Sequence, residues 1–164
     1  MEFMRQTARM LQDEHRRHLA LLGRVESALA RLPRGSARND GELQSLLSAL
    51  AGQIADETER HFDFEEQQLF TRLDQAGDGD IAVLLTEEHA AMRDVASELA
   101  PLLAAARQGT LDDAGWQSLQ QASLELVERQ VSHIQKEEMA LLPMLDQLLA
   151  DDTDAELSMS YASG

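Results

Sequence analysis

The chain has 164 residues and carries 14 Lys and Arg against 30 Asp and Glu, which gives a formal net charge of −16. So acidic a chain is not expected to bind the phosphates of nucleic acids or an anionic membrane surface. It contains no cysteine, which excludes disulfides, thiolate metal sites and cysteine nucleophiles. The sequence has no signal-peptide pattern and no apolar run long enough to span a bilayer, so we expect a cytoplasmic protein.

Three breaks rich in glycine, proline and polar residues, at 33–41, 76–80 and 107–115, divide the chain into four segments. Leu and Ala dominate the apolar residues and only 4% of residues are aromatic, which favours helices over strands. In each segment, apolar residues and histidines recur at the spacing of one helix face. The four stripes are Leu11, His15, His18, Leu22, Val25, Leu29 and Leu32; Leu43, Leu47, Leu50, Ile54, His61, Glu65 and Leu69; Leu85, His89, Met92, Val95, Ala96, Leu99 and Leu103; and Leu119, Leu126, Gln130, His133, Glu137, Leu141 and Leu145.

Four helical segments of similar length, joined by short breaks, predict an all-α, up-down-up-down four-helix bundle over residues 1–150. A helical hairpin that completes its core by dimerising is the alternative, and the similar segment lengths favour the single-chain bundle. Residues 151–164 are acidic and lack an apolar stripe, so we expect a mostly disordered tail. Side chains expected to cap the second, third and fourth helices are Asn39 or Asp40, Asp80, and Asp112.

The fourth segment repeats the second. HIQKEEMALLPMLDQ at residues 133–147 and HFDFEEQQLFTRLDQ at residues 61–75 are identical at seven of fifteen positions. The first and third segments share a weaker repeat, MLQDEH at residues 10–15 and LLTEEH at residues 84–89. The bundle is therefore predicted to be an internally duplicated helical hairpin with approximate two-fold symmetry.

Every histidine of the chain lies on one of the four stripes, and every predicted helix carries at least one: His15, His18, His61, His89 and His133. His61 and Glu65 are four residues apart, as are His133 and Glu137, so each pair lies on one helix face. The distances along the chain from the breaks to the histidines agree between the two hairpins. We therefore expect one histidine from each helix to meet in a single layer.

A layer of imidazoles and carboxylates inside an apolar core is costly unless its polar atoms are satisfied. Two cations, each bound by two imidazoles and bridged by Glu65 and Glu137, would satisfy all of them. Direct pairing of histidine with glutamate, which gives a purely structural polar layer, is the alternative. Nitrogen and oxygen ligands without sulfur favour iron, and manganese or zinc are less favoured.

With these motifs the chain resembles the hemerythrin-like, or HHE cation-binding, family. The similarity is carried by DEHRRHLALL, HFDFEEQQLF, EEHAAM and HIQKEEMALLPML in the four successive segments and covers about residues 8–150. The resemblance implies a four-helix bundle with a non-heme di-iron centre and an oxo or hydroxo bridge. It also implies terminal ligands at His15, His61, His89 and His133, and bridging ligands at Glu65 and Glu137.

The chain departs from the dioxygen-carrying hemerythrins at two positions. Those proteins have a second histidine four residues after that of the third helix, where this chain has Arg93. Their fourth-helix acid lies five residues after its histidine, whereas Glu137 lies four after His133. The ligand set is more similar to that of the iron-centre repair and iron-sensing members. His18, one turn after His15, is either a fifth imidazole ligand on one iron or a residue that packs beside the ligands.

Five other glutamates accompany these motifs. Glu66 and Glu138 follow the proposed bridges and are expected at solvated or edge positions, because they lie about 100° around the helix. Glu14 and Glu88 precede lone histidines, so they either orient imidazoles or lie at the surface. Glu57 is a candidate hydrogen-bond partner for the histidine one turn later.

We expect a di-iron protein that binds or senses dioxygen, nitric oxide or peroxide, or handles iron. The alternatives are a di-iron enzyme of peroxidase-like or nitric-oxide-reducing type, a protein for iron-centre repair or iron donation, and a metal-free helical interaction module. An enzyme is less favoured because the sequence shows no separate acid–base group. The sequence does not identify a protein partner.

Overall fold

The computed structural model describes residues 2–31, 38 and 40–163, and these residues form helices and turns without a strand. The elements are α1 (Gln6–Ala30), α2 (Gly41–Asp56), η2 (Glu57–His61), α3 (Phe62–Phe64), η3 (Glu65–Leu69), α4 (Phe70–Gln75), α5 (Gly79–Gln108), α6 (Asp113–Lys136), η4 (Glu137–Leu141), α7 (Leu142–Leu148) and α8 (Asp151–Ser163), where η denotes a π-helical turn. None of the described helices is both long and apolar enough to cross a membrane.

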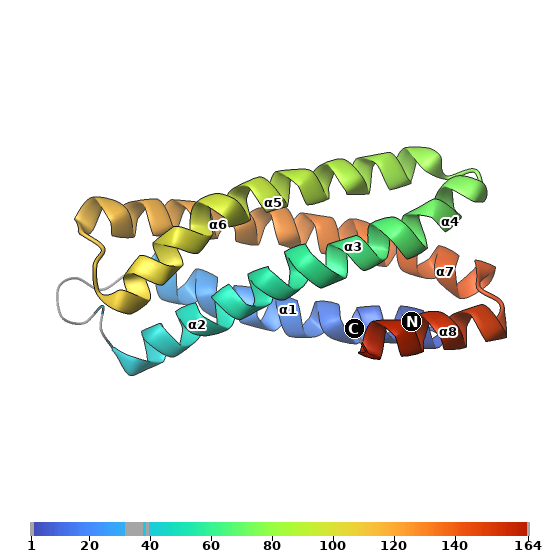
Figure 1. Ribbon diagram of the computed structural model, residues 1–164, viewed down its shortest axis with the longest axis horizontal. Helices are drawn as coiled ribbons and strands as arrows, with labels where there is room; N and C mark the ends of the chain where they lie inside the picture. The colour runs from blue at the N-terminus through green and yellow to red at the C-terminus, as the bar shows by residue number, and fades with distance from the viewer. Residues whose placement is uncertain (1, 32–37, 39, 164) are drawn as a thin grey trace.

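The elements join into four long helices. The first is α1, the second runs without a break from α2 to α4, the third is α5, and the fourth runs from α6 to α7. Both α2 and α6 contact α1, and both also contact α5, so each long helix lies beside its neighbours in the chain and the fourth lies beside the first (Figure 1). The predicted up-down-up-down bundle is therefore confirmed.

The connections follow local rules of helix termination. Gly109 ends α5 with a φ of 73°, and Gly77, between α4 and α5, has a φ of 95°, a left-handed conformation that favours glycine. Asp40 and Asp112 cap α2 and α6 as predicted, because their carboxylates accept hydrogen bonds from first-turn N–H groups. The prediction for Asp80 is wrong: α5 begins at Gly79, so this residue lies within the first turn. The alternative cap Asn39 lies outside the described residues.

All stripe residues predicted from the sequence are buried, apart from Leu32, which lies outside the described residues. The apolar residues of the stripes form two clusters. One contains Leu22, Leu50 and Leu99 and lies toward the end where α1 connects to α2, and the other contains Leu11, Leu69 and Leu141 at the opposite end. The predicted histidine layer lies between the two clusters.

The expectation of a disordered tail is wrong for residues 151–163, which form α8 and pack against α1 (Figure 1). Leu157 and Tyr161, one turn apart, are 5% and 6% exposed and belong to the same apolar cluster as Leu11. Of the four buried residues of α8, only Leu157 and Tyr161 belong to the apolar cluster, too few to produce a recognisable stripe in an acidic segment. The helix is held by its contacts with the bundle, which local sequence does not reveal.

Acidic side chains from the C-terminal part of the chain cap the N-terminus of α1. Arg5 at the N-cap position of α1 provides no side-chain cap. Instead, Asp154 accepts hydrogen bonds from the N–H groups of Gln6 and Thr7, each 2.8 Å long, and Asp146 accepts those of Met4 and Arg5. Free N–H groups and the helix dipole both favour negative charge at this end.

Replacement of Asp154 by Ala should therefore lower the free energy of unfolding by about 1–2 kcal/mol, the usual effect of losing a helix cap. Burial acts to raise the pKa of Asp154, but the hydrogen bonds from Thr7 and Gln6 outweigh it and lower the pKa. The contribution is thus present at neutral pH and is lost as the pH falls through this lowered value. Urea unfolding of the wild type and of Asp154→Ala at pH 7 measures this contribution to the free energy of unfolding. The exposed Glu156→Ala on the same helix is the control, and an equal loss in both variants would contradict the assignment.

Candidate metal centre

Six buried side chains from all four long helices meet between the two apolar clusters: His15, His61, Glu65, His89, His133 and Glu137. None is more than 3% exposed. His15 lies on α1, His89 on α5 and His133 on α6, while the remaining three lie at the ends of π-helical turns. The predicted convergence of one histidine from each helix is confirmed, and both glutamates of the repeated pairs join them.

Three π-helical turns adjoin this layer. η3 begins at Glu65 and η4 at Glu137, in equivalent places of the sequence repeat, and each closes with a hydrogen bond from the N–H five residues later to that glutamate's carbonyl. η2 ends at His61 and is present only in the second helix, because α6 is α-helical through the equivalent residues 129–133. π-Helical turns are rare and occur frequently at functional sites. Neither residue spacing nor composition signalled them.

The six side chains form two groups that share both carboxylates. His15 and His61 form one group with Glu65 and Glu137, and His89 and His133 form the other. Within each group the candidate ligand atoms lie within 4.8 Å of one another. Each group therefore offers two imidazoles and two shared carboxylates, the arrangement that the duplicated sequence predicted for a pair of cations.

The imidazole Nε2 atoms point toward the shared carboxylates. The Nε2 atom of His61 is 3.0 Å from Oε1 of Glu65, and that of His89 is 3.3 Å from the same oxygen. The Nε2 atom of His15 is 3.1 Å from Oε2 of Glu137. The other carboxylate oxygen of Glu137, Oε1, contacts Nε2 of His133. Four imidazole nitrogens and two carboxylates thus converge on one small volume.

This layer is not satisfied by the described residues alone. All four carboxylate oxygens of Glu65 and Glu137 are buried without a hydrogen-bond partner in the described part of the chain. In addition, the Nε2 atoms of His89 and His133 face each other at 3.0 Å, so two neutral imidazoles with protons on Nδ1 would oppose two lone pairs. Bound cations would satisfy the oxygens and the nitrogens together, so the residues fit a metal site.

The outer nitrogen of three imidazoles is hydrogen-bonded to a glutamate of a neighbouring helix. Nδ1 of His15 lies 2.9 Å from Glu138 and Nδ1 of His133 lies 2.8 Å from Glu88. Nδ1 of His89 lies 3.1 Å from Oε2 of Glu66. These contacts favour the tautomer with the proton on Nδ1, which leaves Nε2 free to bind a cation.

These contacts decide the expectations for the accompanying glutamates. Glu66 and Glu138 do not take purely solvated positions, because both carboxylates reach a histidine of the layer. Glu14 and Glu88 do contact imidazoles of neighbouring helices: Glu14 lies 3.4 Å from Nδ1 of His61, and Glu88 contacts Nδ1 of His133. Glu57 contacts His18 instead of the histidine one turn later. The sequence repeat identified all four of the glutamates next to the candidate ligands, but it did not reveal which histidine on a neighbouring helix each one contacts.

The protonation of the metal-free layer follows from the carboxylates within it. Burial acts to lower the pKa of His15 and His89, but the contacting carboxylate of Glu137 outweighs it in both cases and raises the pKa of each to about 9. Burial and the charge of Glu65 oppose each other at His61 in the same way, and its pKa is raised well above the ordinary value. At neutral pH, protons therefore occupy positions that cations would take.

His18 is buried but belongs to neither ligand group. Its Nδ1 atom is 2.6 Å from Glu57, and its Nε2 atom is 3.6 Å from Glu14. Glu57 in turn accepts a hydrogen bond from Gln130. The contacts of His18 thus support the packing interpretation over the fifth-ligand interpretation.

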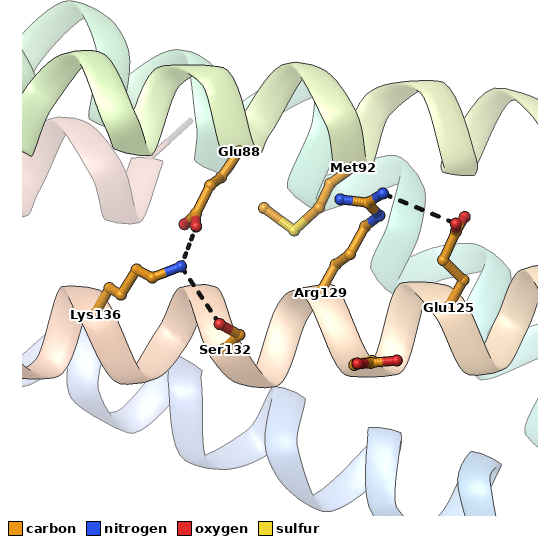
Figure 2. A pocket seen from close by; sticks show the side chains of 7 residues that line it. Glu88, Met92, Glu125, Arg129, Ser132 and Lys136 are labelled. Carbon is orange, nitrogen blue, oxygen red and sulfur yellow. Dashed lines mark hydrogen bonds and ion pairs between the residues drawn. The ribbon is translucent and has the colours of Figure 1, made fainter.

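A surface pocket between α5 and α6 lies on the outer side of the layer. Lys136 and Glu88 form an ion pair at its edge, and Lys136 also approaches Ser132, while Arg129 pairs with Glu125 (Figure 2). None of the six layer residues lines it. Glu88, which lines this pocket, also contacts Nδ1 of His133.

The comparison with protein families agrees with this geometry. The model of the hemerythrin HHE cation binding domain matches residues 6–146, a range that contains all six layer residues and excludes α8. No curated protein matches the chain. The match and the two His/Glu groups together describe a metal-binding protein. The chain belongs to the hemerythrin HHE cation binding domain family.

Proposed function

We propose that the chain is a non-heme di-iron protein that binds dioxygen, nitric oxide or peroxide and reports their presence. His15 and His61 would hold one iron, and His89 and His133 the other. Glu65 and Glu137 would bridge the two. Irons bound in this way would supply coordination positions that a small ligand can occupy.

The observation that carries this proposal is the pair of buried carboxylates without hydrogen-bond partners in the described chain. An isolated buried carboxylate is very costly, and here two lie between two pairs of imidazoles. Nitrogen and oxygen ligands without sulfur support iron over softer metals. The two-fold repeat of the ligand set supports two metals over one.

The burial of the layer supports a small ligand. Glu65, Glu137 and His89 are all 0% exposed, and the apolar clusters close the bundle on both sides. A molecule of two atoms needs little space to reach such a layer, whereas a larger substrate would have to part the helices. Assays for consumption of peroxide or nitric oxide separate ligand binding from turnover.

Freshly purified protein expressed with added iron should contain about two irons per chain. Replacing either Glu65 or Glu137 by Ala should remove at least one of them, because each carboxylate contacts both ligand groups. Elemental mass spectrometry measures the iron, and the absorption spectrum before and after addition of each gas tests ligand binding.

The control is His18→Ala, which removes another buried imidazole that lies outside both groups and should retain two irons. Full iron content in both Glu→Ala variants would contradict the bridging assignment. A folded wild-type chain that neither contains nor takes up metal would contradict the proposed function.

The metal-free and iron-loaded proteins should differ more in stability at pH 8 than at pH 6. The raised pKa values of His15 and His89, about 9, contribute stability to the metal-free protein below about pH 6.5, and this contribution is lost as the pH rises toward 9. Iron replaces these protons, so its binding strengthens over the same range. Anaerobic urea unfolding with and without ferrous iron measures the difference. An equal difference at both pH values would contradict the proton displacement.

A further inference from the structure

Tyr161 reaches the histidine layer from outside the bundle. It lies on α8, beyond the residues matched by the family, and is 6% exposed. Its hydroxyl oxygen is 2.8 Å from Nδ1 of His61, and the hydroxyl proton is donated to Glu14. A side chain that the four-helix bundle does not itself contain is therefore hydrogen-bonded to one candidate metal ligand.

This contact breaks the two-fold symmetry of the layer. In the other hairpin, Nδ1 of the equivalent His133 meets the carboxylate of Glu88 directly at 2.8 Å. At His61 the equivalent carboxylate, Glu14, is 3.4 Å away, and the hydroxyl of Tyr161 makes the shorter contact. At their outer nitrogens, three of the four imidazoles thus contact a carboxylate closely. The fourth contacts a neutral hydroxyl, which in turn donates a hydrogen bond to a carboxylate.

The chemical consequence concerns the strength of the ligand. A carboxylate bonded to the outer N–H of an imidazole increases its basicity and fixes its tautomer, and both effects strengthen the bond to a metal. A hydroxyl accepts the same hydrogen bond but carries no charge, so it polarises the imidazole less. His61 is therefore a weaker metal ligand than His133, although its tautomer and orientation are also fixed by a hydrogen bond.

The ring of Tyr161 is held firmly against the second long helix. The guanidinium of Arg60 lies 4.2 Å from the ring centroid and donates a hydrogen bond of 3.1 Å to the carbonyl oxygen of Tyr161. The centroid of the Phe64 ring lies 4.6 Å from that of the Tyr161 ring. The hydroxyl is thus placed by contacts on the ring and on the backbone, independently of its own hydrogen bonds.

We propose that Tyr161 is a positioning residue that makes the two metal positions inequivalent by holding His61 through a hydroxyl instead of a carboxylate. The inference rests on the proposed di-iron function. It assigns the position bound by His15 and His61 as the more weakly held of the two. It also makes α8 part of the metal centre.

The test uses the full-length chain loaded anaerobically with two equivalents of ⁵⁷Fe(II). Mössbauer spectra of the wild type should contain two quadrupole doublets, one for each iron. Tyr161→Phe retains the ring and its packing and removes only the hydroxyl. Glu14 lies 3.4 Å from Nδ1 of His61, farther than the hydroxyl at 2.8 Å, so the variant loses the closer of the two contacts. One doublet should therefore shift, and one iron should dissociate about tenfold more readily.

Two further variants make the result specific. Ser158→Ala removes a buried hydroxyl from the same helix that donates its hydrogen bond to the carbonyl oxygen of Ala155 and not to the histidine layer, so both doublets should match the wild type. Glu14→Gln retains Tyr161 but removes the charge that accepts its proton, and it should shift the same doublet as Tyr161→Phe.

A shift of both doublets by the same amount in Tyr161→Phe, or of neither, in a protein with two irons would overturn the role of Tyr161 and leave the proposed function intact. A wild-type chain that takes up no iron would overturn both. Circular dichroism of each variant establishes that the comparison is made on folded protein.

Discussion

Two glutamate side chains, buried without hydrogen-bond partners at the centre of a helical bundle, are the constraint on which the rest of the structure depends. A buried carboxylate loses its hydration, which is costly unless positive charge or hydrogen bonds compensate for it. Glu65 and Glu137 are each surrounded by imidazoles whose Nε2 atoms point inward. Without metal the layer must bind protons, and with metal it exchanges them for cations. The layer is therefore built to be completed by positive charge.

The surrounding structure serves to aim these atoms. Two π-helical turns, beginning at Glu65 and Glu137, place one additional residue in the turn at each carboxylate. The next residues, Glu66 and Glu138, also reach neighbouring helices, where they hold the outer nitrogens of histidines. Two consecutive glutamates thus act on two different imidazoles. A regular α-helix separates consecutive side chains by about 100°, which is why the sequence alone predicted solvated positions for the second glutamate.

The parts of the molecule that could be predicted are those encoded by local periodicity or by the repeat. Burial of Leu22 or Leu99 follows from a helical stripe, and the meeting of His61 with Glu65 follows from a four-residue spacing. The π-helical turns, by contrast, have no compositional signature. The docking of α8 depends on Tyr161 and a few other contacts distant in the chain, whose effect exists only once the bundle has formed. Interactions of this kind are tertiary, and no window of sequence contains both partners.

The duplication explains the symmetry of the centre, and the departures from it carry the specific information. Tyr161, His18 and the additional π-helical turn η2 all lie near the His15 and His61 half, whereas the His89 and His133 half has only direct carboxylate contacts at its outer nitrogens. An exact repeat would bind two metals with equal strength and would offer a small ligand two identical positions. In the proposed di-iron centre, residues that weaken the ligands of one half would give the two metals different affinities while both bridges are retained. Since the hydroxyl of Tyr161 is carried by α8, the histidine layer and the docking of the C-terminal helix are connected through its hydrogen bonds to His61 and Glu14.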